Sequence, residues 1–389
     1  MKRLASKENR LRLGFVGGAL DSVIGNTHRY AANLDGEFEL VAGVFSRDPE
    51  RNLAAAQAYG IESDRVYPDY KTMAQSEAAR PDGIQVAAIM TPNATHVPAC
   101  RTFIEQGIDV ICDKPLSTRL DDAQELASLV QERKALLFLT HAYAGYPMVR
   151  EAREQITKGA IGTVRLVQVE HAGAFGVHPL EQQGNSAFAW PVDPAQAGVS
   201  AVLADVGTHA HHLARFVTGD EVTEVSAELS TLVKGRGADD NAHVLLRFGS
   251  GARGMLWASF IAAGNRQGLR LRVFGSGGSL EWNQEEPDNL LLRPQDGPHQ
   301  VLRRGEPWLG ESAKRATRLK AGQPEGMLEA FANIYSDAAE QVRARLDGRL
   351  PSDMSRLCPT VADGVHGMAF IDACVTSHQS EGRWTQVIP

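Results

Sequence analysis

The segment Val110–Leu116, V-I-C-D-K-P-L, decides how the first part of the chain is read, because an apolar run ends there in an acid, a lysine and a proline. Such a run is typical of a buried strand, and Pro115 ends it because proline cannot donate a hydrogen bond to a sheet. Asp113 and Lys114 would then stand at the carboxyl end of a strand, where open α/β sheets bind their ligands. A lysine there can transfer a proton if its pKa is lowered, although these residues alone favour a solvated lysine beside an acid.

Apolar runs alternate with helix patterns on both sides of this segment. A helix is expected at residues 49–59, with Asp48 as its N-cap, Pro49 in its first position and Gly60 after its end. Further helices are expected at 28–34, 95–106 and 121–133, the last capped by Asp121, and strands at 11–17, 38–45, 84–90, 108–112 and 136–139. Continuous apolar strands alternating with helices predict a Rossmann-type domain over residues 1–140, with a parallel, doubly wound sheet.

A glycine-rich turn follows the first expected strand. It holds Gly17, Gly18 and Ala19, and Gly25 comes after a short insert at residues 20–24. Such a turn before a helix lets the backbone approach a pyrophosphate. The spacing is not that of G-x-G-x-x-G, so a phosphate cradle and a tight structural turn both remain open.

The end of the second strand bears on the choice of cofactor. NAD-binding domains usually place a carboxylate there to hold the ribose diol, whereas this chain has Ser46 and Arg47. A hydroxyl and a guanidinium suit a 2′-phosphate and favour NADP over NAD. Asp48 is close enough in sequence to hold the diol instead, and a solvated arginine at a helix start is the alternative without a ligand.

The pattern changes after Leu139. Strands at 164–169, 221–233, 242–248, 254–260, 269–275 and 278–282 are joined mostly by short turns, which predicts an α+β domain at 141–389 with a large open, mainly antiparallel sheet. Helices are expected at 147–158, 324–342 and 361–375, the last packing back on the first domain. Tyr143 and Tyr146, in the crossover between the domains, would contact a polyol or pack between the domains. Trp190 lies in a segment that looks like an active-site loop.

One helix of this second part carries a polar face. It is expected at residues 203–217, where Val206, Ala210, Leu213 and Val217 form an apolar stripe. Asp205, His209 and His212 fall on another face. These three residues could ligate a metal, could form a cap with partly exposed histidines, or could form an acid–base pair in which the carboxylate orients the imidazole.

Three of these segments together resemble one family. The residues M-T-P-N-A-T-H-V-P at 90–98, G-I-D-V-I-C-D-K-P-L at 107–116, and D-x-G-x-H from Asp205 through Gly207 to His209 resemble the glucose–fructose oxidoreductase / inositol dehydrogenase (Gfo/Idh/MocA) family. Asp113 stands where most members have glutamate, and His212 where many have aspartate. These differences and the irregular glycine turn leave details of pyrophosphate contact and substrate choice open.

The resemblance implies functional residues. The cofactor would be bound by the glycine turn, by the end of the second strand and by two loops, comprising Gly17, Gly18, Ala19, Gly25, Ser46, Arg47, Thr91, Pro92, Asn93, His96, Asp113, Lys114 and Pro115. The substrate would contact Lys114, Tyr143, Tyr146, Trp190, Asp205 and His209. Lys114, His209 and Asp205 would be catalytic, with His209 accepting a proton, Lys114 stabilising the oxyanion and Asp205 orienting His209. No metal is expected.

The implied activity is the transfer of hydride between NAD(P) and a secondary alcohol or ketone of a sugar, a sugar derivative or an inositol. Two alternatives remain: an NAD-dependent glycosidase that oxidises its substrate transiently, and a non-catalytic nucleotide or sugar sensor. The family typically uses its open sheet for subunit association, so we expect a homodimer or homotetramer.

Composition excludes several other classes. A formal net charge of −7 argues against nucleic acid as a partner. No apolar run is long enough to span a bilayer, and the charged N-terminus lacks the apolar core of a secretory signal. The 4 cysteines show no C-x-x-C spacing and lie in apolar surroundings, as expected of reduced core residues in a cytoplasmic protein.

Overall fold

The computed structural model describes residues 9–179, 181 and 198–389 and divides into two compact units. The first unit holds the chain up to Ser117 together with Asp121–Gly145 and Met327–Gly364. The second holds Thr118–Leu120, Tyr146–Gly326 and Val365–Pro389. The chain therefore returns to complete the first unit after most of the second has been formed.

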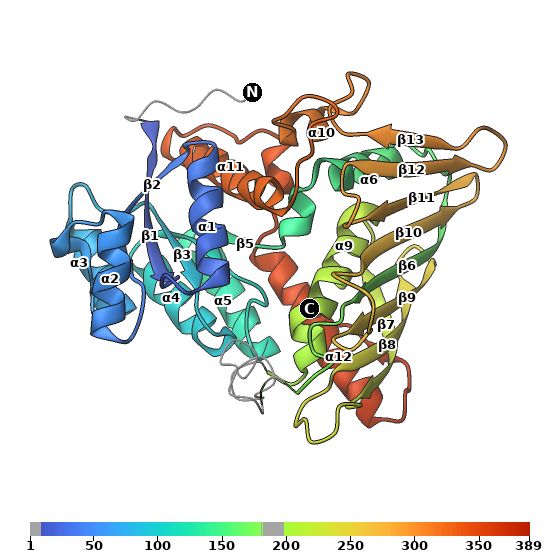
Figure 1. Cartoon of the computed structure of the whole chain (residues 1–389), viewed down its shortest axis with the longest axis horizontal. Coiled ribbons are helices and arrows are strands. Elements are labelled where there is room, and N and C mark those ends of the chain that lie inside the picture. The colour runs from blue at the N-terminus through green and yellow to red at the C-terminus, as the bar shows by residue number, and fades with distance from the viewer. Residues whose placement is uncertain (1–8, 180, 182–197) are drawn as a thin grey trace. The chain divides into compact units, whose positions relative to one another are not determined.

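The first unit is built on a parallel sheet, as the apolar runs predict. Its strand order among the described residues is β2-β1-β3-β4-β5 (Figure 1). The strands are β1 (Leu11–Gly17), β2 (Phe38–Val44), β3 (Val86–Met90), β4 (Asp109–Cys112) and β5 (Leu137–Leu139). Because the chain steps from β1 to β2 and then back across β1 to β3, the carboxyl ends of β1 and β3 form the switch point where such sheets bind ligands.

Helices flank this sheet. They are α1 (Val23–Leu34), α2 (Pro49–Tyr59), α3 (Tyr70–Ala79), α4 (His96–Glu105), α5 (Leu120–Arg133) and α11 (Met327–Leu346), with short 3₁₀ turns at 63–65, 93–95, 142–145 and 355–357. The predicted ends of α2 are confirmed, because Asp48 accepts hydrogen bonds from two backbone N–H groups and Gly60 is left-handed. The helix expected at 28–34 begins earlier, because Ser22 caps it. The prediction of Asp121 as a cap is wrong, because α5 already includes Leu120.

The helix α11 supplies part of the core of the first unit. It packs on α1, and its Phe331 and Tyr335 are buried among residues of the β1 region. The hydroxyl of Tyr335 lies 2.6 Å from Nδ1 of His28, which is fully buried in α1. Nε2 of His28 has no hydrogen-bond partner among the described residues. Burial therefore lowers the pKa of His28 to about 4.

The second unit is built on a mixed, mostly antiparallel sheet. Its order among the described residues is β13-β12-β11-β10-β6-β9-β8-β7-β14, and the pair β6–β9 is parallel (Figure 1). The strands are β6 (Val164–Ala172), β7 (Val222–Ser230), β8 (Asn241–Phe248), β9 (Arg253–Ser259), β10 (Leu269–Gly275), β11 (Gly278–Asn283), β12 (Asn289–Pro294), β13 (Gln300–Arg303) and β14 (Thr385–Gln386). The expected large open sheet is confirmed, and β12, β13 and β14 extend it beyond the predicted strands.

Helices lie against one face of this second sheet. They include α6 (Pro147–Thr157), a π-helical turn at Leu203–Gly207, α9 (Thr208–Thr218) and α12 (Val361–Gln379), and α10 (Glu311–Ala316) packs on α6. The helix α9 contacts β6, β9 and β10, while α6 contacts β11 and β12. The other face carries exposed side chains such as Leu166, Leu245 and Met255. Among the described residues, no helix combines the length and apolarity needed to cross a membrane.

The buried pair of Tyr335 and His28 gives a first test. Replacing Tyr335 by Phe removes the hydroxyl that contacts His28 and leaves the imidazole without that partner. We expect the free energy of unfolding to fall by about 1–3 kcal/mol, the usual cost of a buried polar group that loses its hydrogen bond. Urea titration measures the change, and Tyr30→Phe, at a half-exposed position on α1, is the control. Equal stability of the Tyr335→Phe and wild-type proteins would contradict the role given to this contact.

The lowered pKa of His28 predicts a pH dependence of stability. In the unfolded chain His28 has the ordinary histidine pKa of 6.5, whereas in the folded chain its pKa is about 4. As the pH falls, the unfolded chain therefore binds the proton first. The contribution of neutral His28 is therefore complete above pH 6.5 and is lost as the pH falls towards 4. Urea midpoints measured across this range should fall more steeply in the wild type than in His28→Gln. Parallel curves would show that His28 does not titrate in this way.

Candidate active site

The glycine turn after β1 brings two backbone segments into close contact. Gly17 has φ of +92°, and a Cβ there would lie 2.6 Å from the carbonyl oxygen of Met90. A Cβ on Gly25, in the first turn of α1, would lie 2.4 Å from Cα of Gly18. Ala19, which lies between Gly17 and Gly25 in the sequence, is buried. Only glycine fits at Gly17 and Gly25, and this close packing of strand, turn and helix is what a dinucleotide-binding turn requires.

The end of β2 presents a polar turn. Phe45 N and Ser46 N donate to Oδ1 of Asn52, at 2.7 and 3.4 Å, and Ser46 Oγ accepts from Asp48 N. Asp48 Oδ1 accepts from the backbone N–H groups of Glu50 and Arg51, at 2.9 and 3.0 Å. Arg47 is exposed. The carboxylate of Asp48 is thus engaged in capping α2, while Ser46 and Arg47 remain at the strand end where the ribose would lie.

A buried histidine joins the two loops that carry the motif residues. Nδ1 of His96 lies 2.7 Å from the carbonyl oxygen of Pro115, and its Nε2 lies 2.8 Å from that of Thr91. Asn93, beside it, is also buried, whereas Pro92 is exposed. Burial has the largest influence on the His96 pKa and lowers it, and the nearby Asp113 and the two carbonyls oppose that shift. His96 fixes the loop after β3 to the loop after β4.

The residues that follow β4 are held in the same way. Asp113 Oδ1 accepts from Thr140 Oγ1, at 2.6 Å, and from Lys114 N, at 3.1 Å. Asp113 N donates to Ile89 O of β3. Pro115 is buried, and Lys114 before it is partly exposed at the carboxyl end of the sheet. Asp113 therefore anchors the end of β4, next to Lys114.

The aromatic residues proposed from sequence have different surroundings. Tyr143 is buried in the 3₁₀ turn at Ala142–Gly145, which ends the segment Asp121–Gly145 of the first unit. Tyr146 is buried in the second unit, with its ring 5.3 Å from that of Trp282 and its hydroxyl accepting from Gln284 Nε2 at 3.4 Å. These contacts are those of a packing residue. Trp190 lies outside the described residues.

Asp205 and His209 lie where a π-helical turn passes into α9. The π turn spans Leu203–Gly207, and a Cβ on Gly207 would lie 2.7 Å from Cδ2 of Leu203. Asp205 and His209 are partly exposed, whereas their immediate neighbours are buried. Turns of this kind are frequent at functional sites. The apolar stripe expected on this helix is confirmed, because Val206, Ala210, Leu213 and Val217 are all buried.

A partly exposed carboxylate holds the start of this helix. Asp239 accepts from Ser200 Oγ and, at 2.7 Å, from Ala201 N. Ser200 Oγ in turn accepts from Leu203 N at 3.2 Å. Burial raises the pKa of Asp239 despite these hydrogen bonds. The loop between β7 and β8 thus fixes the segment that leads into Asp205.

The structure adds His171, a residue that the sequence did not single out. It is buried at the end of β6, with Nδ1 3.2 Å from Val206 O and its ring 5.9 Å from that of His209. The available signal was its place in the alternation of the strand, where Val167 and Val169 occupy the preceding buried positions. His212 is buried and stacks on Phe216, so it faces a different environment from His209. No cluster of three or more His, Cys, Asp or Glu side chains suited to a metal occurs among the described residues.

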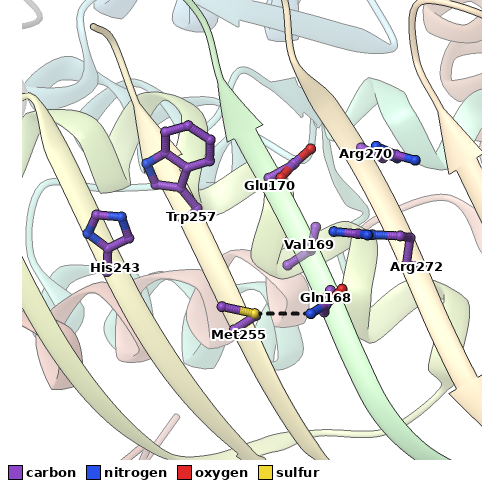
Figure 2. A pocket seen from close by; sticks show the side chains of 8 residues that line it. All are labelled: Gln168, Val169, Glu170, His243, Met255, Trp257, Arg270 and Arg272. Carbon is purple, nitrogen blue, oxygen red and sulfur yellow. Dashed lines mark hydrogen bonds between the residues drawn. The ribbon is translucent and has the colours of Figure 1, made fainter. Parts of the chain in front are cut away.

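A separate pocket of about 370 Å³ lies on the uncovered face of the second sheet (Figure 2). Its walls come from β6, β8, β9 and β10, and the lining residues are Gln168, Val169, Glu170, His243, Met255, Trp257, Arg270 and Arg272. Gln168 Nε2 lies 3.2 Å from the sulfur of Met255. The pocket contains none of the residues expected to be catalytic.

The proposed catalytic residues come from both units. Lys114 belongs to the first unit, and Asp205 and His209 belong to the second. Each unit orders its own residues, and the assembly of all three around one substrate remains a prediction.

The chain is similar to known oxidoreductases over both units. Residues 11–141 match the oxidoreductase family with an NAD-binding Rossmann fold, and residues 149–281 match the GFO/IDH/MocA C-terminal domain. The oxidoreductase YfiI of Bacillus subtilis is 35% identical over 99% of this chain and 98% of its own length. Inositol 2-dehydrogenase of Rhizobium meliloti is 27% identical over 74% of this chain and 80% of its own length.

Solved structures show the same relationship. The inositol dehydrogenase homologue of Azotobacter vinelandii complexed with NAD⁺ is 38% identical, covers 99% of this chain and 98% of its own, and superposes with a TM-score of 0.93. The same homologue with NADH and myo-inositol gives 36% identity over 99% of both chains and a TM-score of 0.90. With both domains matched and a relative this similar over its full length, the chain belongs to the Gfo/Idh/MocA family of NAD-binding oxidoreductases.

Proposed function

We propose that this protein oxidises a secondary alcohol of a sugar, a sugar derivative or an inositol, or reduces the corresponding ketone, with a nicotinamide dinucleotide. The observation that carries the proposal is the position of Lys114, two residues after the end of β4, on the loop that His96 connects to the loop after β3. The relatives add support, because one solved homologue holds NADH and myo-inositol and a levoglucosan dehydrogenase holds NADH and levoglucosan.

The roles of the residues follow from their chemistry. A bound nicotinamide supplies a hydride acceptor for the carbinol carbon. His209 accepts the hydroxyl proton as the alcohol becomes a carbonyl, and the ammonium of Lys114 stabilises the developing oxyanion. Asp205 orients His209 or holds a neighbouring substrate hydroxyl. The positive charge of lysine makes a metal unnecessary in this scheme.

Further substrate contacts are proposed for Tyr143 and Trp190. Tyr146 was a third candidate, and its contacts with Trp282 and Gln284 favour a packing role that supports the site. The buried, reduced cysteines suit a cytoplasmic enzyme.

We propose that the cofactor site accepts NADP as well as NAD. Two solved structures of homologues contain NAD⁺ or NADH, so binding of NAD is the case with which binding of NADP is compared. Ser46 and Arg47 support NADP, because Arg47 is exposed at the end of β2 and Asp48, the carboxylate next to it, is engaged by backbone N–H groups of α2. A 2′-phosphate would gain a charge-assisted hydrogen bond from the guanidinium.

The catalytic assignment predicts the effect of removing each group. Lys114→Ala and His209→Ala should each lower kcat by about 10²–10⁴-fold, the usual contribution of a positioned proton-transfer or charge-stabilising group. The measurement is NADH production with a panel of inositols and sugars, with NADH binding titrated in parallel. Binding should remain close to that of the wild type.

Lys71→Ala, which removes an exposed lysine of α3, is the matched control and should leave kcat unchanged. Near-normal turnover in both Lys114→Ala and His209→Ala would rule out the assignment. Release of product from glycosides without net NADH formation would instead support transient oxidation.

We further propose that the protein is a homodimer or homotetramer formed through the uncovered face of the second sheet. Leu166, Leu245 and Met255 are 52%, 51% and 46% exposed on adjacent strands β6, β8 and β9. Leu245 pairs with Met255 across β8 and β9. Met255 and Trp257 lie on the same face as the charged side chains of Arg270 and Arg272 (Figure 2). Burial of such a face by a second copy of the chain would remove this apolar area from water.

Charged substitutions at this face should break the oligomer. The double variant Leu166→Glu/Met255→Glu buries no new charge in the monomer, because both side chains already face outward. We expect it to elute as a monomer of about 42 kDa in size-exclusion chromatography with light scattering, where the wild type is larger. Leu350→Glu changes a residue that is 82% exposed in the first unit and serves as the control. A monomeric wild type would contradict the proposal.

A further inference from the structure

An ion pair connects the two segments that would hold the adenosine half of the cofactor. Nη2 of Arg51 lies 2.6 and 2.7 Å from the two carboxylate oxygens of Asp21. Asp21 lies in the turn between β1 and α1, and Arg51 lies in the first turn of α2, just after β2. In a Rossmann domain the first of these segments contacts the pyrophosphate and the second contacts the ribose.

The pair is exposed and therefore easy to separate. The side chains of Arg51 and Asp21 are 56% and 73% exposed. Ion pairs at such positions contribute about 0–1 kcal/mol, so Arg51 can exchange its partner at little cost. The turn has a second tie to α2, because the hydroxyl of Tyr59 donates to Gly18 O at 3.0 Å. Opening the ion pair therefore leaves this tie between the turn and α2 intact.

Other charged groups near the pair have fixed or different roles. Asp48 uses one carboxylate oxygen to accept from Glu50 N and Arg51 N, so it caps the helix. Glu50 and Arg47 are exposed, and neither forms an ion pair with another side chain among the described residues. Asp21 is the carboxylate that contacts the Arg51 guanidinium.

We propose that the Asp21–Arg51 pair sets the ratio of NADP to NAD affinity. Arg51 is, in addition to Arg47, a guanidinium that can bind a 2′-phosphate, and Asp21 competes with the phosphate for it. The inference rests on the proposed use of NADP. A phosphate monoester carries a charge of about −1.5 to −2 and pairs bidentately with arginine, so it can replace the Asp21 carboxylate as the partner of Arg51. The 2′-hydroxyl of NAD leaves the ion pair undisturbed.

The competition makes opposite predictions for the two partners. Asp21→Asn should tighten NADPH binding about tenfold, because Arg51 becomes available for the phosphate, and should change NADH binding by less than about twofold. Arg51→Gln should weaken NADPH binding about tenfold and leave NADH unchanged. In the double variant, Asp21→Asn should bring no gain, because it acts only through Arg51.

Isothermal titration of the full-length protein with NADH and with NADPH measures these constants. Glu50→Gln is the control. It also removes one negative charge, from a residue in the first turn of α2 whose carboxylate does not pair with Arg51. Its effect on the affinity for NADPH should be smaller than that of Asp21→Asn. Equal effects of Asp21→Asn on both cofactors, no gain in NADPH binding, or unchanged NADPH binding in Arg51→Gln would overturn the inference. Because binding is read without turnover, a protein that shows these shifts but oxidises no polyol contradicts only the proposed activity.

Discussion

The carboxyl edge of the first sheet depends on one buried imidazole. His96 contacts the carbonyl oxygens of Thr91 and Pro115, so a single side chain fixes the distance between the loops after β3 and β4. The hydrogen bond from Thr140 to Asp113 continues this connection to the end of β5. Three neighbouring strand ends are thereby linked, and Lys114 projects from a backbone whose position is set before any ligand arrives. Such preorganisation is what a proton-transfer or oxyanion-stabilising group needs.

The second unit orders its polar helix by different means. Asp239 and Ser200 hold the start of the helix. Within the π turn, Gly207 leaves room for the side chain of Leu203, because a Cβ at position 207 would lie 2.7 Å from Leu203 Cδ2. His171 contacts the carbonyl of Val206 from the end of β6. Asp205 and His209 are thus supported from a loop and from a strand. The support comes from residues far apart in sequence, so their burial and pairing are consequences of the tertiary fold.

The sequence predicted those features that rest on local physical chemistry. The strands β1 and β10 and the helix α2 have their predicted bounds, because apolar runs and the Asp48 and Gly60 ends specify them directly. The predicted start of α1 was wrong, because residues 20–24 were assigned to an insert in the glycine turn, whereas Ser22 caps a helix that begins at Val23. The motif residues predicted the family, whereas His171 and Asp239 were missed, because a single polar residue in a strand or loop carries no period. The contact between His28 and Tyr335 spans 307 positions, which no local pattern can reveal.

The late return of the chain to the first unit has a consequence for biosynthesis. Residues 146–326 must leave the ribosome before α11 can supply Phe331 and Tyr335 to the core beside β1. At a synthesis rate of about 5–20 residues per second, the nucleotide-binding strands wait on the order of 10 to 40 s with part of their apolar surface uncovered. The nascent first unit therefore exposes a surface that chaperones bind, and its folding is timed by the emergence of a segment near the far end of the chain.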